Sequence, residues 1–147
     1  MRRHESEKCF GVQVAGGDVE VMTKFAQFAE EQVDCDFVDI NCGCPLEDVH
    51  KRGAGSRLMA RAKAMEGIVR CMSSSLKTKH LTLKMRTADI EDNKKHSEFA
   101  GRYAHKLMPQ LEAWGVSAIT LHGRTGRQRY TKLADWSYVN ECSKRRE

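Results

Sequence analysis

The 147-residue sequence is long enough for one domain or part of a larger one, and its 40% hydrophobic and 31% charged residues suit a soluble globular chain. No apolar run approaches the length of a membrane span, and residues 1–7 lack the apolar core of a signal peptide, so we expect a cytoplasmic protein, with the nucleus as a further location. The formal net charge of +5 permits a polyanionic partner without requiring one.

The six cysteines fit a reduced compartment better than a disulfide scaffold, because no secretion signal precedes them. Cys42 and Cys44 are close enough in sequence to share a metal ion. However, no second cysteine pair has the spacing of a zinc site, so no metal site is expected.

Apolar and alternating runs predict four strands, and helical spacing predicts the segments between them. The predicted strands cover residues 10–15, 37–41, 81–86 and 118–122. The predicted helices cover residues 19–32, 56–73 and 94–114, and a last helix starts at about residue 135. Asp18 should cap the first helix, Pro109 should kink or divide the third, and Gly115 should end it.

The apolar faces of two helices and the character of two loops can also be predicted. The first helix is expected to bury Val21, Met22, Phe25, Phe28 and Ala29. The third is expected to turn Phe99, Tyr103, Leu107, Leu111 and Trp114 inward. Residues 87–93 should form a polar loop and residues 123–132 a basic one.

Helical crossovers of this length make the strands parallel, in either a doubly wound sheet or part of an eight-stranded barrel. Polar residues stand at the end of every predicted strand: Gln13, Asn41 with Cys44, Lys84 with Arg86, and His122. One polar group at each strand end is typical of a barrel. A dinucleotide-binding sheet would have Gly-x-Gly-x-x-Gly after its first strand, and this sequence does not. We therefore predict an α/β fold, a partial TIM (β/α)8 barrel of about four consecutive β/α units.

Four motifs in order carry a family resemblance: VQVAG at 12–16, DINCGCP at 39–45 with GAGSxLM at 53–59, LKMR at 83–86, and LHGRTxxQxY at 121–130. They resemble the tRNA-dihydrouridine synthases. The run YTKLADW at 130–136 is most similar to the eukaryotic third branch of that family.

The resemblance implies an FMN-binding barrel that reduces uridine in tRNA to 5,6-dihydrouridine with NADPH, followed by a helical tRNA-binding domain. Third-branch members also carry N-terminal zinc fingers, and neither addition has a counterpart here. Residues 1–147 would then be a fragment of the catalytic domain that holds strands three to six of the barrel. We expect such a fragment alone to hold FMN weakly or not at all and to be inactive.

The chemistry can be argued from the uracil ring, since hydride delivered to C6 leaves enolate character at C5 that an acid must protonate. A cysteine thiol is mostly protonated at neutral pH and can do this. By its place in the motif Cys44 is that acid, whereas Cys42 should pack in the core. The resemblance puts Gln13, Lys84 and His122 on FMN, where the lysine would stabilise the anionic reduced ring.

The remaining predicted contacts are with the substrate. Asn41 should order the site or touch the uracil, and Arg86 and Arg124 should face phosphate or the RNA backbone. In the last motif the family usually has arginine where Gly126 stands, with Arg127 alongside, and this weakens one expected contact.

Two other functions are compatible with the sequence. The chain could be a non-catalytic remnant that binds RNA or a protein partner through its basic loops. It could also be another FMN barrel, of the dihydropyrimidine or dihydroorotate dehydrogenase type, which uses a cysteine or serine at a strand end. The motif at 124–130 favours the tRNA enzyme over the second of these.

Overall fold

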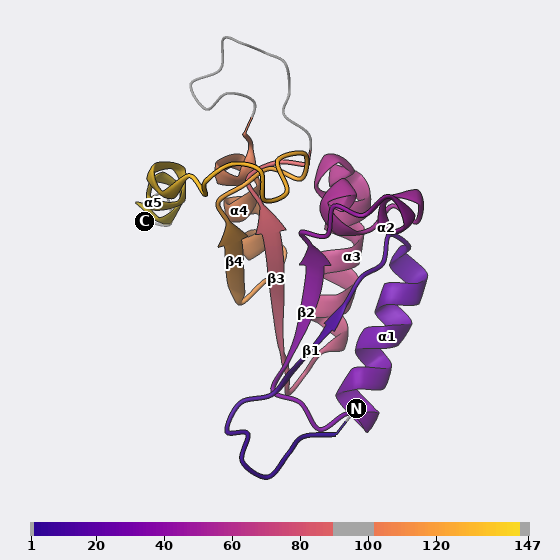
Figure 1. The fold of residues 1–147 in the computed structure, drawn as a ribbon. Coiled ribbons are helices and arrows are strands. Elements are labelled where there is room, and N and C mark those ends of the chain that lie inside the picture. The colour runs from indigo at the N-terminus through magenta and orange to yellow at the C-terminus, as the bar shows by residue number, and fades with distance from the viewer. Residues whose placement is uncertain (1, 90–101, 145–147) are drawn as a thin grey trace.

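A computed structural model describes residues 2–89 and 102–144, whose strands form one parallel sheet (Figure 1). The strands are β1 (Gly11–Val14), β2 (Phe37–Cys42), β3 (His80–Arg86) and β4 (Ala118–His122). They lie side by side in the order of the sequence, β1-β2-β3-β4. A doubly wound sheet would reverse its order at a switch point, so the predicted partial TIM barrel is confirmed.

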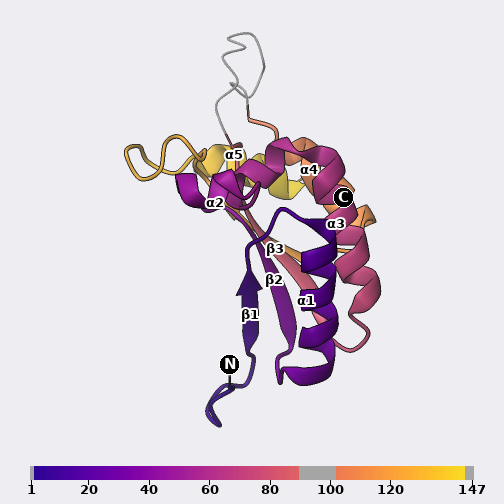
Figure 2. The same ribbon diagram turned by 90° about the vertical axis from the view of Figure 1, so that its right-hand side faces the viewer.

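Helices connect these strands and cover one face of the sheet. They are α1 (Val19–Gln32), α2 (Glu47–Lys51), the 3₁₀ helix η1 (Gly55–Ala60), α3 (Ala62–Ser75), α4 (Ala104–Ala113) and α5 (Trp136–Lys144). Figure 2 shows α1 and α3 packed side by side against one face of the sheet, while no helix of the described residues lies along the opposite face. None of the described helices is long and apolar enough to cross a membrane.

Side chains along each strand alternate between these two faces. On the helix side the core holds Val38 and Ile40 from β2 and Leu81, Leu83 and Met85 from β3. The other face is polar. A barrel places its ligand-binding side chains where the strands stop, so polar residues are expected at that end of this face. The parallel register sets its spacing: Asn41 pairs with Lys84, and Arg86 pairs with His122.

The first helix has the predicted bounds and the predicted cap, because the Asp18 carboxylate accepts a hydrogen bond of 2.9 Å from the backbone N–H of Val21. Its predicted face is partly wrong. Val21 is 64% exposed and Phe28 52% exposed, whereas Met22 and Ala29 are buried as predicted. The helix contacts the sheet and α3 through a narrower stripe, so the margins of the apolar face stay in solvent.

The predicted helix at 56–73 is wrong in its first turn and a half. Residues 47–51 form the unpredicted α2, residues 55–60 form η1, and α3 begins only at Ala62. The cause is a tight turn: Gly53 and Gly55 have φ of +66° and +63°, a left-handed region that glycine enters without strain. Residue 55 must also be a glycine for space, because a Cβ there would lie 2.5 Å from the Cys44 carbonyl oxygen.

The predicted helix at 94–114 is only partly described, and residues 94–101, with Phe99, lie outside the described part of the chain. Helix α4 begins at Ala104, so Tyr103 precedes it. Pro109 lies inside α4 without dividing it. A proline removes one helical hydrogen bond, and here the packed side chains on both sides of it, Met108 and Leu111, keep the helix intact.

The start of the predicted polar loop at 87–93 is buried, contrary to expectation. Thr87, Ala88 and Asp89 are at most 2% exposed, and the backbone N–H of Thr87 bonds to the Arg124 carbonyl. Residues 90–93 lie outside the described part. The loop is buried because it lies under the segment that follows β4.

The last helix begins as predicted, after Asp135, whose carboxylate caps it by accepting from the Tyr138 backbone N–H at 2.9 Å. Tyr138 is buried, while Trp136 is 75% exposed.

We predict that Asp18→Ala lowers the free energy of unfolding by about 1 kcal/mol, because an N-cap that accepts a backbone N–H is lost. Urea unfolding followed by circular dichroism measures this. Gln27→Ala, on the exposed side of the same helix, is the control and should change stability little. Equal stability of both variants would mean that the cap does not hold the helix.

Candidate functional site

A pocket of about 190 Å³ lies where the four strands end. It is lined by Gln13, Asn41, Gly43, Cys44, Pro45, Lys84, Met85, Arg86, His122 and Tyr130. Every residue predicted for the site is in that lining except Arg124, which lies directly behind His122. The structure therefore brings together groups that are far apart in sequence, and it adds Tyr130.

Asn41 holds the loop that carries Cys44. Its side-chain oxygen accepts hydrogen bonds from the backbone N–H groups of Gly43 at 3.1 Å and Cys44 at 2.9 Å. Its amide nitrogen donates to the Gln13 side chain at 2.8 Å. Of the two roles predicted for Asn41, ordering the site is the one that these contacts serve.

The two cysteines at the end of β2 are in different surroundings. Cys42 is fully buried on the helix side of the sheet, and burial raises the pKa of its thiol far above the ordinary value. Cys44 is partly exposed and lines the pocket, and it is a free thiol. Of these two cysteines, only Cys44 can therefore exchange a proton with a ligand in this pocket.

Asp39 is a site residue that the sequence interpretation missed. Its carboxylate accepts from the Gln13 amide nitrogen at 2.6 Å and from the Thr82 hydroxyl at 2.7 Å. A usable signal was present, because Asp39 and Asn41 occupy alternate positions of one strand and must share a face. The carboxylate fixes which way the Gln13 amide points, with its oxygen toward Asn41.

Lys84 is an exposed cation on the polar face, beside Asn41 in the register. Within the described part of the chain its ammonium has neither a hydrogen-bond partner nor an ion-pair partner. A cation left free beside a thiol and a histidine suits a ligand that carries or develops negative charge.

His122 packs against two residues of the following loop. Its ring centroid lies 5.9 Å from that of Tyr130, and the Arg124 guanidinium carbon lies 5.5 Å from the Tyr130 ring. An Arg124 nitrogen is 3.1 Å from His122 Nε2, and since arginine can only donate, Nε2 is the acceptor and the ring proton is on Nδ1. Burial, helped by Arg86, Arg124 and Lys84, lowers the pKa of His122 below its usual 6.5, so the ring is neutral at pH 7.

Arg86 connects two loops and is only 3% exposed. Its Nε donates to the Gly43 carbonyl at 2.7 Å, and Nη1 donates to the Thr125 carbonyl at 3.1 Å. Burial lowers the pKa of the guanidinium below its usual value. The geometry gives Arg86 the role of joining the loops after β2 and β4, with only its edge on the pocket.

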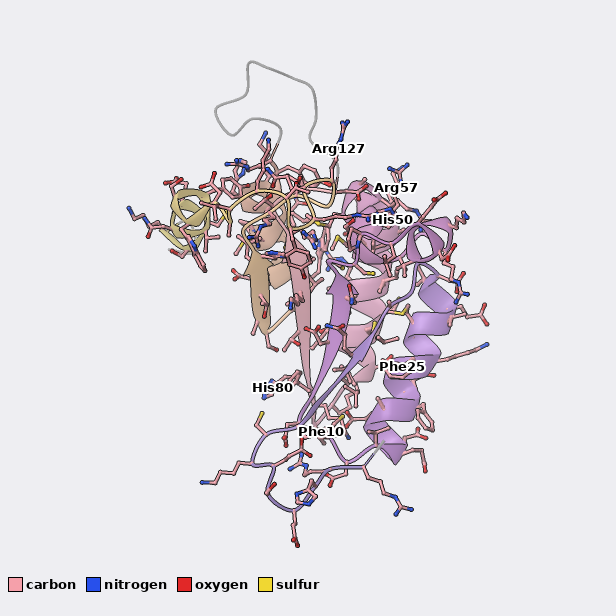
Figure 3. The ribbon with its side chains drawn as sticks, viewed as in Figure 1. Phe10, Phe25, His50, Arg57, His80 and Arg127 are labelled. Carbon is pink, nitrogen blue, oxygen red and sulfur yellow. The ribbon has the colours of Figure 1, made fainter. Side chains whose placement is uncertain are left out.

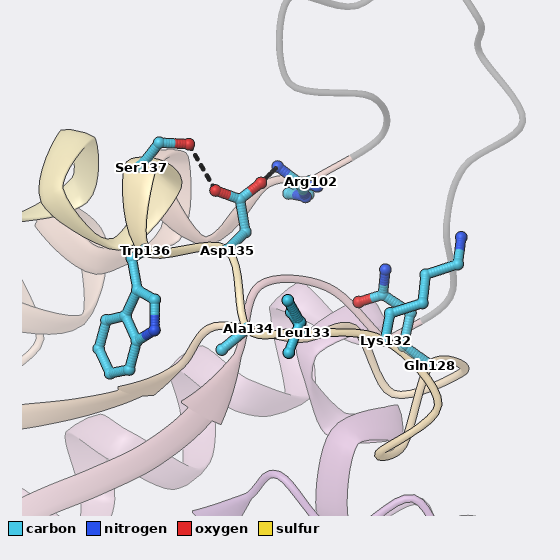
Figure 4. A pocket seen from close by; sticks show the side chains of 8 residues that line it. All are labelled: Arg102, Gln128, Lys132, Leu133, Ala134, Asp135, Trp136 and Ser137. Carbon is cyan, nitrogen blue, oxygen red and sulfur yellow. Dashed lines mark hydrogen bonds and ion pairs between the residues drawn. The ribbon is translucent and has the colours of Figure 1, made fainter.

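A larger hollow of about 600 Å³ lies elsewhere, around the start of α5 (Figure 4). Its Asp135 is already engaged by Arg102, Ser137 and the Tyr138 backbone, and these contacts lower the pKa of the carboxyl. No residue predicted for the site lines this hollow. The smaller pocket, which holds the thiol, the lysine and the histidine, is therefore the candidate site.

No group of three histidine, cysteine, aspartate or glutamate side chains in residues 2–89 and 102–144 is arranged to hold a metal ion.

Comparison with known proteins shows which family the chain belongs to. Residues 1–146 match the family described as Dihydrouridine synthase (Dus). The chain belongs to this family. It is 47% identical over 144 residues to a Xenopus laevis protein named tRNA-dihydrouridine(47) synthase NAD(P)(+)-like, covering 98% of this chain and 21% of that protein.

Two further relatives carry the same name or nearly so. The human tRNA-dihydrouridine(47) synthase NAD(P)(+)-like is 46% identical over 142 residues, covering 97% of this chain and 20% of that protein. The tRNA-dihydrouridine(47) synthase NAD(P)(+) of Coprinopsis cinerea is 46% identical over 145 residues, with the same coverage of 97% and 20%. The chain thus spans about a fifth of the length of the curated relatives it matches, and the resemblance to the third-branch enzymes is confirmed.

The surroundings of Gly126 leave no room for the arginine that the family resemblance predicts there. A Cβ on Gly126 would lie 2.3 Å from the Asp89 carbonyl oxygen and 2.9 Å from the Ser56 hydroxyl. The side chain expected from the family pattern would therefore not fit without moving the buried segment after β3.

We predict that the His122 imidazole titrates below pH 6.5 in an NMR titration, and that Arg124→Gln moves its pKa up toward the ordinary value. The variant removes a nearby positive charge and the donor to Nε2. Arg127→Gln, an exposed arginine in the same loop, is the control and should leave the His122 pKa in place.

The same shift predicts a direction for stability. Because the folded-state pKa lies below the unfolded one, the unfolded chain binds more protons as the pH falls through about 6.5. The free energy of unfolding should therefore fall between the unfolded and the folded pKa of His122, and level off below both. A wild-type imidazole that titrates above pH 6.5 would contradict the burial of this ring.

Proposed function

We propose that this chain carries the acid and the flavin-ring contacts of an enzyme that reduces uridine in tRNA to 5,6-dihydrouridine with NAD(P)H. The observation that supports this most directly is the single pocket that contains the Cys44 thiol together with Gln13, Lys84 and His122. A thiol, a free cation and a neutral imidazole converging on one polar strand end match what uracil reduction requires.

The residues present fit FMN. A flavin has acceptors and a donor along one edge of its pyrimidine ring. The Gln13 amide can meet them, because Nε2 has a second N–H besides the one given to Asp39, and Oε1 can accept a second bond besides the one from Asn41. Lys84 supplies a positive charge, and the neutral His122 has an N–H on Nδ1 to donate. When bound, FMN would supply the hydride chemistry after reduction by NAD(P)H.

Cys44 supplies the proton in this proposal. As hydride reaches C6 of the uracil, the electron pair of the C5–C6 double bond shifts onto C5, and the Sγ–H bond of Cys44 breaks to form the new C5–H bond. The thiolate left behind recovers its proton from water. Asn41 and Arg86 hold the loop in place during this step, through Cys44 N–H and the Gly43 carbonyl.

The substrate proposed for this site is a uridine of tRNA, presented at the edge of the sheet where Arg124 and Tyr130 lie. Tyr130 is 78% exposed, so its ring can stack on a base, and the Arg124 guanidinium beside it can meet a phosphate. The side chain of Lys84 lies on the polar face of the sheet, and we propose that it neighbours the flavin rather than the RNA.

We predict that Cys44→Ala abolishes dihydrouridine formation while FMN binding persists, whereas Cys42→Ala retains most of the activity. The measurement is dihydrouridine in tRNA after incubation with NADPH. It is made on a chimera in which residues 1–146 replace the matching segment of the full-length human relative.

The two cysteines are matched, since they lie two positions apart in one segment. Cys42→Ala leaves a small cavity, so the assay temperature should lie below the unfolding transition of that variant. An active Cys44→Ala variant would refute the assignment of the acid.

We also predict that Lys84→Ala and His122→Ala reduce the ratio of flavin to protein, or slow flavin reduction by NADPH. Both remove a group that faces the pocket. Lys106→Ala, on the exposed side of α4, is the control and should do neither. Absorbance of the purified chimera measures the ratio, and identical ratios and reduction rates in all three variants would rule out this cofactor site.

A further inference from the structure

A second polar cluster lies behind Cys44, on the side away from the pocket. It consists of His50 in α2, Ser56 in η1 and Asp89 just after β3. Ser56 is fully buried and Asp89 is 2% exposed. Figure 3 shows His50 and Arg57 at the end of the molecule where the strands stop, far from His80 at the start of β3.

The donor and acceptor of each hydrogen bond in this cluster can be assigned. His50 Nε2 lies 3.1 Å from the Cys44 carbonyl oxygen and 2.9 Å from the Ser56 hydroxyl. A carbonyl can only accept, so Nε2 carries the proton. The Ser56 hydroxyl in turn donates to Asp89 Oδ1 at 2.8 Å. The chain of bonds therefore joins the Asp89 carboxylate to the main chain of Cys44.

Both main-chain groups of Cys44 are thereby restrained. Its N–H donates to Asn41, and its carbonyl accepts from the Ser56 N–H at 2.9 Å as well as from His50. Gly55 makes the close approach possible, because any side chain there would collide with Cys44. The thiol can then move only by rotating about its own Cα–Cβ bond.

Asp89 is the anchor of the cluster. A buried carboxylate is costly unless it is paired and hydrogen-bonded, and Asp89 Oδ2 accepts from Arg57 Nη1 at 3.3 Å. Its own N–H donates to the Tyr103 hydroxyl at 3.1 Å. Gly126 packs directly on it. The anchor therefore joins the loop after β2, the start of the α4 segment and the loop after β4.

We propose that His50, Ser56 and Asp89 are positioning residues that fix the Cys44 thiol in the pocket by holding its main chain. This inference rests on the proposed role of Cys44 as the acid. The cluster does not touch the pocket itself, so it acts only through Cys44. Its contribution is to keep the proton donor in one place, since a donor displaced by about 1 Å loses much of its rate.

The test is the rate at which iodoacetamide alkylates Cys44 in the full chain, located by peptide mass spectrometry. Loss of the restraint should let the loop open and raise this rate by about fivefold in His50→Ala and in Asp89→Asn, because each variant removes a hydrogen bond or an ion pair. His50→Gln can still donate to the Cys44 carbonyl and should restore the rate of the unchanged chain. The readout needs neither FMN nor RNA, so it stands apart from a failure of the proposed activity.

Two internal controls separate positioning from general loosening. Cys71, which is partly exposed on α3, is the reference thiol, and His80→Ala is the matched variant at the opposite end of the sheet. A Cys44 rate that rises while the Cys71 rate stays constant supports the proposal. It is overturned if the two rates rise together, if the Cys44 rate changes less than twofold, or if His50→Gln behaves like His50→Ala.

Discussion

The parallel pairing of β2 with β3 is the constraint on which the site depends. It sets Asn41 beside Lys84, and the next pairing sets Arg86 beside His122. Because side chains alternate along a strand, a slip of one residue in either pairing would send the whole polar set into the helix-covered face and bring the core residues out. The apolar residues between the polar ones hold this register, so the core and the site are specified by the same alternation.

Charge in the pocket is unevenly distributed, and this bears on the chemistry. Lys84, Arg86 and Arg124 bring positive charge to the neighbourhood of His122, whereas Asp39 is the carboxylate of the same face and is engaged by Gln13 and Thr82. Together with burial, these positive charges lower the pKa of His122, so its imidazole is neutral. A positive pocket with a neutral histidine favours a bound group that becomes more negative during the reaction.

Gly126 is the position where the family resemblance and the packing of this chain can be compared. Residues 1–146 match the family, and the relatives compared with the chain are 46–47% identical to it over nearly its whole length. Gly126 is the position at which the sequence predicts a departure from the family pattern, and Asp89 and Ser56 fill the space where a side chain at that position would lie. The cluster behind Cys44 is thus packed as one unit, and a change at any of these positions requires an adjustment at the others.

The sequence alone was sufficient for the order and type of the strands, the cap at Asp18, the barrel class and six residues of the pocket lining, because these follow from local periodicity and from polar residues at strand ends. It did not predict the part played by Tyr130 and Asp39. It was insufficient for the segment between β2 and α3, for the exposure of Val21 and Phe28, and for the partners of Asp39 and Asp89. Those depend on contacts between residues that are distant along the chain: Gly55 must approach Cys44, and Asp89 must meet Ser56 across 33 positions. The helical spacing of apolar residues does not predict such long-range contacts. It shows which face of a helix is apolar, but not which residues pack against that face. Only the packed sheet decides that, because it fixes which loops end side by side.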